Sequence, residues 1–241
     1  MELSAVVIGL FASVLLGGSL VAYLHTNNKN QWIKLLLAFS GGFLLAIIFE
    51  HLLPDLYHDE DKSVGLYILY GFLIQLILEY FSGGIEHGHV HVHSKQQLPW
   101  LLFLSLSIHS IIEGIPLGNH FAGIESEDHH QHDTLFWGII FHQIPVAVAL
   151  MTLLYHTTLK PWLKWLVLGL FGIMTPLGVF LGLTVSPTNL GIDVHMILAV
   201  VVGMFLHIST TIIFETSENH KFNLLKLMSI IIGVILAMVM Y

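Results

Sequence analysis

Residues 105–118 read SLSIHSIIEGIPLG and place His109 and Glu113 four residues apart, in a stretch otherwise apolar enough to cross a bilayer. An ionisable group at mid-membrane costs on the order of 2.5 to 3.5 kcal/mol, so such a residue usually marks a functional polar pathway. Residues i and i+4 share one face of a helix. An imidazole and a carboxylate on one face can bind a small divalent cation together, because Zn²⁺ accepts both ligand types. We therefore predict that this helix carries metal ligands.

The composition of the whole chain is that of a membrane protein. Of its 241 residues, 55% are hydrophobic and only 10% are charged. A hydrocarbon core about 30 Å thick needs roughly 17 to 25 apolar residues per helix. The sequence therefore predicts an all-α, polytopic membrane protein that consists of one transmembrane domain, residues 1–241. Its eight expected helices lie near 3–24, 32–53, 64–82, 98–118, 135–155, 162–184, 194–214 and 223–241.

Two further features of the composition restrict the function. Cysteine is absent, so a metal must be bound by histidine, carboxylate, hydroxyl or carbonyl groups. The first apolar run has no basic segment before it and no small-residue cleavage signal close behind it, which favours a retained span over a removed signal peptide.

The lysines predict the orientation, because they are the only residues with a fixed positive charge and the chain has no arginine. All but Lys62 fall in or beside the odd-numbered connections: Lys29, Lys34, Lys95, Lys160, Lys164, Lys221 and Lys226. The positive-inside rule then puts these connections in the cytoplasm and both termini on the outer side. The even-numbered connections are acidic and form an outer face that would concentrate cations. The alternative is that they are ordinary solvated loops.

Two of the predicted connections are rich in histidine. The third, at about 83–97, is cytoplasmic by this topology, and the fourth, at about 119–134, combines histidines with acids on the outer side. Flexible runs of imidazoles bind most late divalent metals, so each connection is a candidate for weak metal binding, with a solvated polar linker as the alternative. The histidines are His87, His89, His91 and His93 in the third, and His129, His130 and His132 in the fourth.

A second apolar helix repeats the pattern of a polar residue followed by proline. In FHQIPVAVAL, residues 141–150, His142 precedes Pro145 by three residues, just as Glu113 precedes Pro116. Proline has no amide donor and leaves a carbonyl without its helical hydrogen bond. Two other histidines lie in apolar runs. We consider His51 for metal entry, with an interfacial role as the alternative, and His207 as a relay ligand, with a packing role as the alternative.

Taken in order, these segments resemble the ZIP (Zrt/Irt-like) family of divalent metal transporters. HSIIEG at 109–114 is similar to the fourth-span signature of that family, in which a histidine, a small polar residue and an acid line the transport site. The other matching segments are GGFLLAIIFEHLLPDL at 41–56, ILEYFSGGIEHGHVHVH at 77–93, HQIPVA at 142–147, FGIMTPLGVFLG at 171–182 and GMFLHIST at 203–210.

The resemblance implies eight helices, arranged as two inverted three-helix repeats around a central pair (3+2+3), with metal bound between the fourth and fifth spans. Many members carry an asparagine, an acid and a glutamate where this chain has Ser110, Val146 and Thr175, and an acid in place of Ile212. These departures remove the ligands of a second metal. We therefore expect a single-metal site made by His109, Glu113 and His142, with Ser110, Gln143 and Thr175 as weaker oxygen donors.

The resemblance, together with the asymmetry of the lysines, implies transport of a divalent metal toward the cytoplasm, across a plasma or inner membrane, by a protein that is not an enzyme. Zn²⁺ is the first expectation, and Fe²⁺, Cd²⁺ and Mn²⁺ stay open as cargo. The expected partners are metal ions and the lipid bilayer but not nucleic acid, and a homodimer stays open. One alternative is a membrane-embedded zinc hydrolase with His109, His142 and His207 as ligands and Glu113 as base, although the sequence has no HExxH element. Another is a metal sensor that does not transport.

Overall fold

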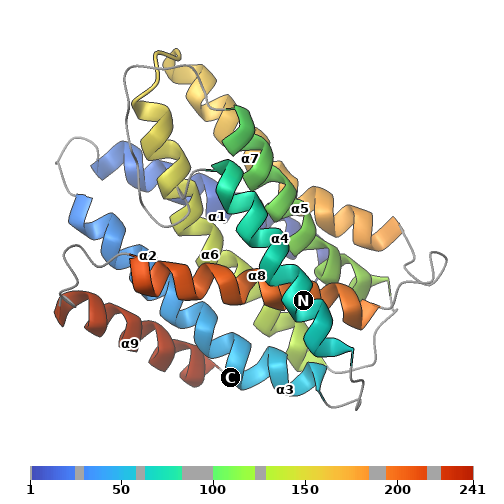
Figure 1. Ribbon diagram of the computed structural model, residues 1–241. Coiled ribbons are helices and arrows are strands. Elements are labelled where there is room, and N and C mark those ends of the chain that lie inside the picture. The colour runs from blue at the N-terminus through green and yellow to red at the C-terminus, as the bar shows by residue number, and fades with distance from the viewer. Residues whose placement is uncertain are drawn as a thin grey trace.

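The computed structural model describes residues 2–24, 30–57, 63–82, 100–122, 129–184, 194–215 and 224–240. These residues form a bundle of helices with no strand among them (Figure 1). The helices are α1 Leu3–Leu24, α2 Asn30–Ile47, η2 Ile48–Leu52, α3 Leu53–Leu56, α4 Val64–Ser82, α5 Trp100–Phe121, α6 His129–Tyr155, α7 Pro161–Thr184, α8 Val194–Glu215 and α9 Leu224–Met240.

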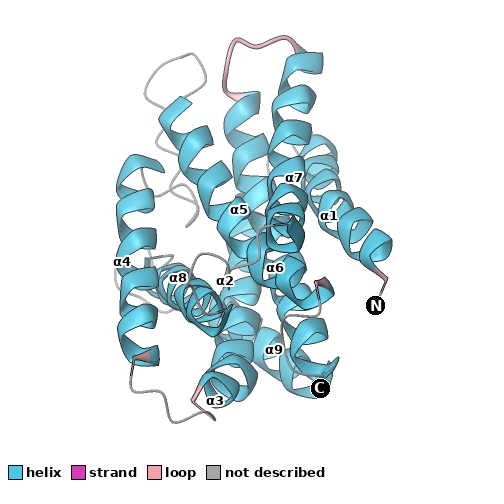
Figure 2. Ribbon diagram, turned by 90° about the vertical axis from the view of Figure 1, so that its right-hand side faces the viewer, coloured by secondary structure: helices cyan, strands magenta, loops and turns pink. Residues whose placement is uncertain are grey.

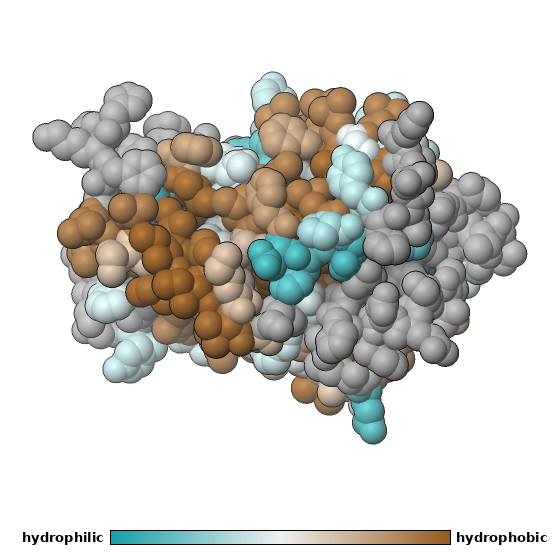
Figure 3. All heavy atoms as spheres, turned by 90° about the horizontal axis from the view of Figure 1, so that it is seen from below, coloured by the Kyte–Doolittle hydropathy of each residue, from teal (hydrophilic) through white to brown (hydrophobic). Residues whose placement is uncertain are grey.

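Seven of these segments are long and apolar enough to cross a membrane, with α2, η2 and α3 counted as one, and α9 is a shorter apolar helix. At 1.5 Å per residue its 17 residues span about 25 Å, slightly less than a hydrocarbon core. Hydrophobic side chains cover a large part of the face shown in Figure 3. The prediction of a polytopic, all-α membrane protein is confirmed, and the predicted spans match the helices closely.

The fourth connection differs from the prediction. We expected it at about 119–134, but α5 continues to Phe121 and α6 already begins at His129. An apolar run marks where a helix leaves the hydrocarbon, whereas its internal hydrogen bonds let it continue into water. Hydropathy therefore predicts a longer connection, and shorter helix ends beside it, than the structure has.

Irregular backbone occurs where the sequence did not predict it. A π-helical turn, η2, interrupts the second span between α2 and α3. By contrast, α5, α6 and α7 continue through Pro116, Pro145 and Pro176. Each proline removes one amide donor without ending its helix. π-Bulges are frequent at functional sites, and this one carries His51.

The helices pack as close pairs, α5 with α7, α2 with α9, α4 with α8 and α1 with α6. The pairs join into two groups: α1, α5, α6 and α7 form one, and α2, α4, α8 and α9 form the other (Figures 1 and 2). Contacts of α2 with α6 and of α4 with α5 connect the groups. The share of residues that are buried within the apolar stretch of a span is highest in α6, at 67%, and lowest in α4, at 22%. Helix α6 therefore lies at the centre of the bundle and α4 at its lipid-facing edge.

Glycine permits the close approach within these pairs. A Cβ on Gly203 of α8 would overlap the carbonyl oxygen of Ile68 on α4, and one on Gly71 would overlap the carbonyl of Val200. The α5/α7 pair is built in the same way, since a Cβ on Gly118 would overlap the carbonyl of Val179. Small residues are the usual means by which membrane helices bring their backbones together.

Candidate metal site

Three buried side chains meet in the interior of the bundle. His109 and Glu113 come from the middle of α5, and His142 comes from α6. Their candidate ligand atoms all lie within 4.8 Å of one another, the only group of three or more such residues found in the described part of the chain. The structure therefore brings together the three residues that the sequence proposed as the strong ligands.

The carboxylate lies at the centre of this group. Glu113 Oε1 contacts His109 Nε2 and lies 3.7 Å from His142 Nε2. The two imidazole rings are 5.7 Å apart between centroids, with an interplanar angle of 83°. Both Nε2 atoms therefore approach the same oxygen from different helices.

This arrangement fits a small divalent cation. Two ligand atoms bound to a tetrahedral Zn²⁺ at roughly 2.0–2.1 Å lie about 3.3 Å apart, close to the observed distance between Glu113 and His142. Glu113 Oε2 is buried and accepts no hydrogen bond within the described residues. An ionised carboxylate in such surroundings is costly unless a cation compensates it. Two imidazoles and one carboxylate are a suitable donor set for Zn²⁺.

Two of the three weaker donors predicted from the sequence, Gln143 and Thr175, lie in a separate hydrogen-bond network. Gln143 accepts a hydrogen bond from Ser13 of α1 at 2.9 Å and donates one to Thr175 of α7. All three side chains are buried. The Gln143 amide is thus already engaged on both its oxygen and its nitrogen. Ser13 was missed by the sequence analysis because it lies 130 residues from its partner in the chain.

Ser110, the third of the weaker donors, is buried on α5 directly after His109.

An aromatic side chain beside the site comes from the group of helices formed by α2, α4, α8 and α9. Phe205 of α8 is fully buried, and its ring centroid lies 6.1 Å from that of His142. Phe205 belongs to a segment that matches the family, 203–210, but the sequence pattern does not predict that its ring lies beside His142.

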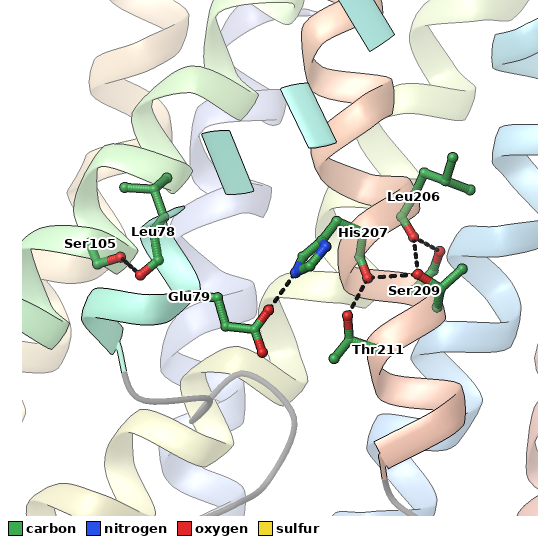
Figure 4. Close-up of polar contacts among 8 residues, drawn as sticks. Leu78, Glu79, Ser105, Leu206, His207, Ser209 and Thr211 are labelled. Atoms are coloured by element: carbon green, nitrogen blue, oxygen red, sulfur yellow. Dashed lines mark hydrogen bonds and ion pairs between the residues drawn. The ribbon is translucent and has the colours of Figure 1, made fainter. Parts of the chain in front are cut away.

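His207 lies outside the three-residue group. Its Nε2 contacts Glu79 of α4, as Figure 4 shows. The threonines on the same helix, Thr210 and Thr211, donate to the backbone carbonyl of His207 rather than to its imidazole. The side chain of Glu79 is only 14% exposed and is paired with His207.

The remaining predicted residues are placed as follows. His51 is half-buried in η2 at the far end of the second span. His87, His89, His91 and His93 lie outside the described residues. The backbone of His129, His130 and His132 belongs to the first turn of α6, and their side chains lie outside the description.

The described lysines gather at one end of the bundle, where α2, α7 and α9 begin. Lys164 Nζ donates to the carbonyl of Tyr155 at the end of α6, at 3.3 Å, and Lys226 Nζ donates to that of Ile213 near the end of α8, at 2.8 Å. A cation there complements the negative end of a helix dipole. We call this the lysine end.

The described residues thus define a polytopic, all-α membrane protein, whose bundle encloses a buried group of two histidines and one carboxylate that could hold a metal ion. The family model described as ZIP Zinc transporter matches residues 2–99 and 83–241. The chain belongs to the ZIP zinc transporter family. This membership favours a transporter over the membrane-embedded hydrolase.

Three known proteins are similar to parts of this chain. The chain is similar to Zinc transporter ZIP1 of Danio rerio, with 29% identity over 109 residues that cover 45% of this chain and 34% of that protein. It is similar to Zinc transporter ZIP1 of Takifugu rubripes, with 28% identity over 153 residues, 60% of this chain and 48% of that protein. It is also similar to Protein zntD of Dictyostelium discoideum, with 29% identity over 167 residues, 62% of this chain and 24% of that protein. The chain thus spans between 24% and 48% of the length of these relatives.

Proposed function

We propose that this protein transports a divalent metal, with Zn²⁺ as the first candidate, through a single site formed by His109, Glu113 and His142. The observation that carries the proposal is the convergence of these three buried side chains near the middle of α5 and α6. The names of the two fish relatives, both zinc transporters, support the choice of cargo.

One metal, rather than two, is the number that the site supports. Val146, where many family members have an acid, is apolar and buried, and Thr175 is hydrogen-bonded to Gln143. Glu113 is then the only carboxylate among the ligands. A divalent ion there keeps about one unit of positive charge uncompensated unless water or dipoles help, so it binds loosely. Loose binding suits transport, because the ion must leave as well as enter.

The donor set also predicts selectivity. Two imidazoles and one carboxylate suit Zn²⁺ and Fe²⁺, whereas Mg²⁺ and Ca²⁺ prefer more oxygen ligands. We expect Cd²⁺ and Mn²⁺ to compete with Zn²⁺, and Mg²⁺ and Ca²⁺ to leave its uptake unchanged.

The direction that we propose is toward the cytoplasm. Lys34, Lys160, Lys164 and Lys226 stand at the lysine end, which the positive-inside rule assigns to the cytoplasmic side. Both termini then face outward from a plasma or inner membrane, and the ion enters from the acidic outer side.

Zinc uptake into proteoliposomes tests the proposal. We would compare the wild type with His109→Ala and Glu113→Ala at matched incorporation, and with His156→Ala as a control that removes an exposed histidine beyond the end of α6. We expect saturable flux in the wild type and the control, and loss of flux in both site variants. Wild-type flux in the site variants would contradict this mechanism. Absence of flux with Zn²⁺ still bound in detergent would favour a metal sensor.

A further inference from the structure

Asn119 is a buried polar residue of α5 that the metal site does not use. Its side chain is fully buried, and neither its amide nitrogen nor its amide oxygen has a hydrogen-bond partner among the residues that the structure describes. Burying an amide without a hydrogen bond is costly, and nearly all buried polar groups in folded proteins bind either a protein atom or water. The side chain of Asn119 therefore requires an explanation.

The position of Asn119 excludes it from the metal site. It lies six residues beyond Glu113, which places it about 9 Å further along α5 and about 120° around the helix. Its side chain thus leaves α5 on a different side from the ligands. Between these two residues α5 carries no other polar side chain, since the sequence from Gly114 to Gly118 is GIPLG. Asn119 is therefore a separate polar position rather than a further metal ligand.

Asn119 also lies toward the end of the bundle opposite to the lysine end. Helix α7 begins at the lysine end. Helix α5 runs parallel to α7, because Gly114 and Gly118 of α5 meet, in the same order, Gly178 and Gly182 of α7. Asn119 stands only two residues before the end of α5. In the orientation proposed above, this end faces the outer side.

Neither packing nor capping accounts for an amide at this position. The contact of this part of α5 with α7 is made by the backbone, since a Cβ on Gly182 would lie 2.9 Å from the backbone nitrogen of Asn119. Phe121 on the same helix packs against an apolar cluster. The end of α5 is closed by the backbone amide of Ala122, which donates to the carbonyl of Gly118 at 3.2 Å. A leucine, which has nearly the shape of asparagine, would serve the packing equally well.

A second polar group without its helical partner lies on the same side of α5. Pro116 has no amide hydrogen, so it cannot donate the helical hydrogen bond to the carbonyl of Ile112. Ile112 precedes Asn119 by seven residues, which is close to two full turns. Helical carbonyls point toward the end of a helix and side chains lean toward its start, so the two groups approach each other along the helix. In membrane helices, ordered water is one of the groups that satisfy carbonyls released by proline.

We propose that Asn119, together with the carbonyl of Ile112, binds water inside the bundle, and that this water enters from the outer side at the end of α5. A carboxamide both donates and accepts hydrogen bonds, as water does, so one or two water molecules can satisfy Nδ2, Oδ1 and the carbonyl together. A cation would engage only the two oxygens and leave the nitrogen unpaired. The bound water gives α5 a hydrated break beside Pro116, one turn beyond Glu113. The inference uses the orientation proposed above but not the transport of metal.

Thiol labelling tests whether water from the outer side reaches residue 119. The chain has no cysteine, so Asn119→Cys gives the full-length protein a single thiol, and the wild type is the blank. A charged methanethiosulfonate reagent that does not cross membranes is added to intact cells. Val179→Cys is the matched control, because Val179 is also fully buried and its carbonyl lies against Gly118, next to Asn119 in the chain. We expect residue 119 to react from outside at least tenfold faster than residue 179.

Thermal unfolding in detergent tests the binding of water independently. If water is bound, Asn119→Leu displaces it and leaves the carbonyl of Ile112 unpaired, so we expect the Tm to fall by roughly 2–4 °C. If the amide is buried without water, the same substitution removes an unpaired polar group, and the Tm should rise.

Three results would overturn the proposal. Residue 119 would react no faster than residue 179, or would react only after the membrane is permeabilised, or Asn119→Leu would unfold at a higher Tm than the wild type. None of these measurements needs metal. Wild-type zinc flux in His109→Ala would remove the proposed metal mechanism without changing the result at residue 119, so the two failures are distinguishable.

Discussion

Glu113 Oε1 lies 3.7 Å from His142 Nε2, although the two residues come from helices that pack mainly on other partners. The closest neighbour of α5 is α7, and that of α6 is α1. The distance between the two ligands is therefore determined by how tightly each helix sits on its own neighbour, and a small change at a remote helix contact should be felt at the metal.

The α5/α7 contact offers the first test of this dependence. Gly118→Ala places a Cβ against the carbonyl of Val179, so α5 must move away from α7. We expect a loss of about 1–3 kcal/mol in the free energy of unfolding, as in other overpacked sites, and weaker Zn²⁺ binding. Thermal unfolding in detergent and zinc titration measure the two effects.

Gly169→Ala is the control, on α7, the helix that Gly118 of α5 packs against. No atom lies within 4 Å of the Cβ that it would add, and alanine is favoured over glycine in a helix by up to about 1 kcal/mol. It should leave Zn²⁺ binding unchanged and stability equal or higher. If Gly118→Ala proves as stable as Gly169→Ala, the close contact does not restrain α5.

The single carboxylate provides the second prediction. Glu113→Gln keeps the shape of the side chain but removes the only negative charge among the ligands, so we expect Zn²⁺ affinity to fall by at least tenfold, about 1.4 kcal/mol. Isothermal titration in detergent measures this change. Glu50→Gln, at an exposed position of η2, makes the same chemical change and should bind Zn²⁺ like the wild type. Equal affinity in Glu113→Gln would show that the carboxylate is not a ligand.

The network around Gln143 gives the third prediction. Because the amide accepts from Ser13 and donates to Thr175, we expect it to support the packing of α1, α6 and α7 rather than to bind metal. Ser13→Ala should lower the free energy of unfolding by about 1 kcal/mol and leave Zn²⁺ affinity within twofold. Gln143→Leu should cost more, because it removes both hydrogen bonds at once and leaves only Ser13 with another acceptor, the carbonyl of Leu10. A tenfold loss of affinity in Gln143→Leu, with unchanged stability, would instead identify Gln143 as a ligand.

The parts of the structure that the sequence predicted are those that local patterns encode. Hydropathy located the spans because each helix must match the thickness of the hydrocarbon. Spacing put His109 and Glu113 on one face because they are four residues apart on one helix. The motif around His142 supplied the third member of the group through the family resemblance.

What the sequence did not predict depends on contacts between distant segments. Glu79 meets His207 across 128 residues, and Ser13 meets Gln143 across 130. Neither partner is signalled by periodicity, because the pairing follows from which helices share a glycine contact or a common neighbour. The π-helical turn at η2 was missed for a different reason, since it depends on one extra residue within a turn and leaves the apolar pattern of the span unchanged.

The position of Phe205 beside His142 gives the last prediction. Phe205 is fully buried, and its ring lies 6.1 Å from the imidazole, centroid to centroid. Phe205→Ala would open a cavity next to a metal ligand, and a buried phenylalanine replaced by alanine typically costs about 3–5 kcal/mol. We expect the imidazole of His142 to sample more orientations before metal binds, which raises the entropy lost on binding and weakens Zn²⁺ affinity. Phe205→Leu should retain most of the stability and most of the affinity. Phe180→Ala, which removes a phenylalanine that is 60% exposed on α7, should change neither. Zinc titration of the variants that remain folded measures the affinity. If Phe205→Ala binds Zn²⁺ as tightly as the wild type, α5 and α6 alone hold His142 in place.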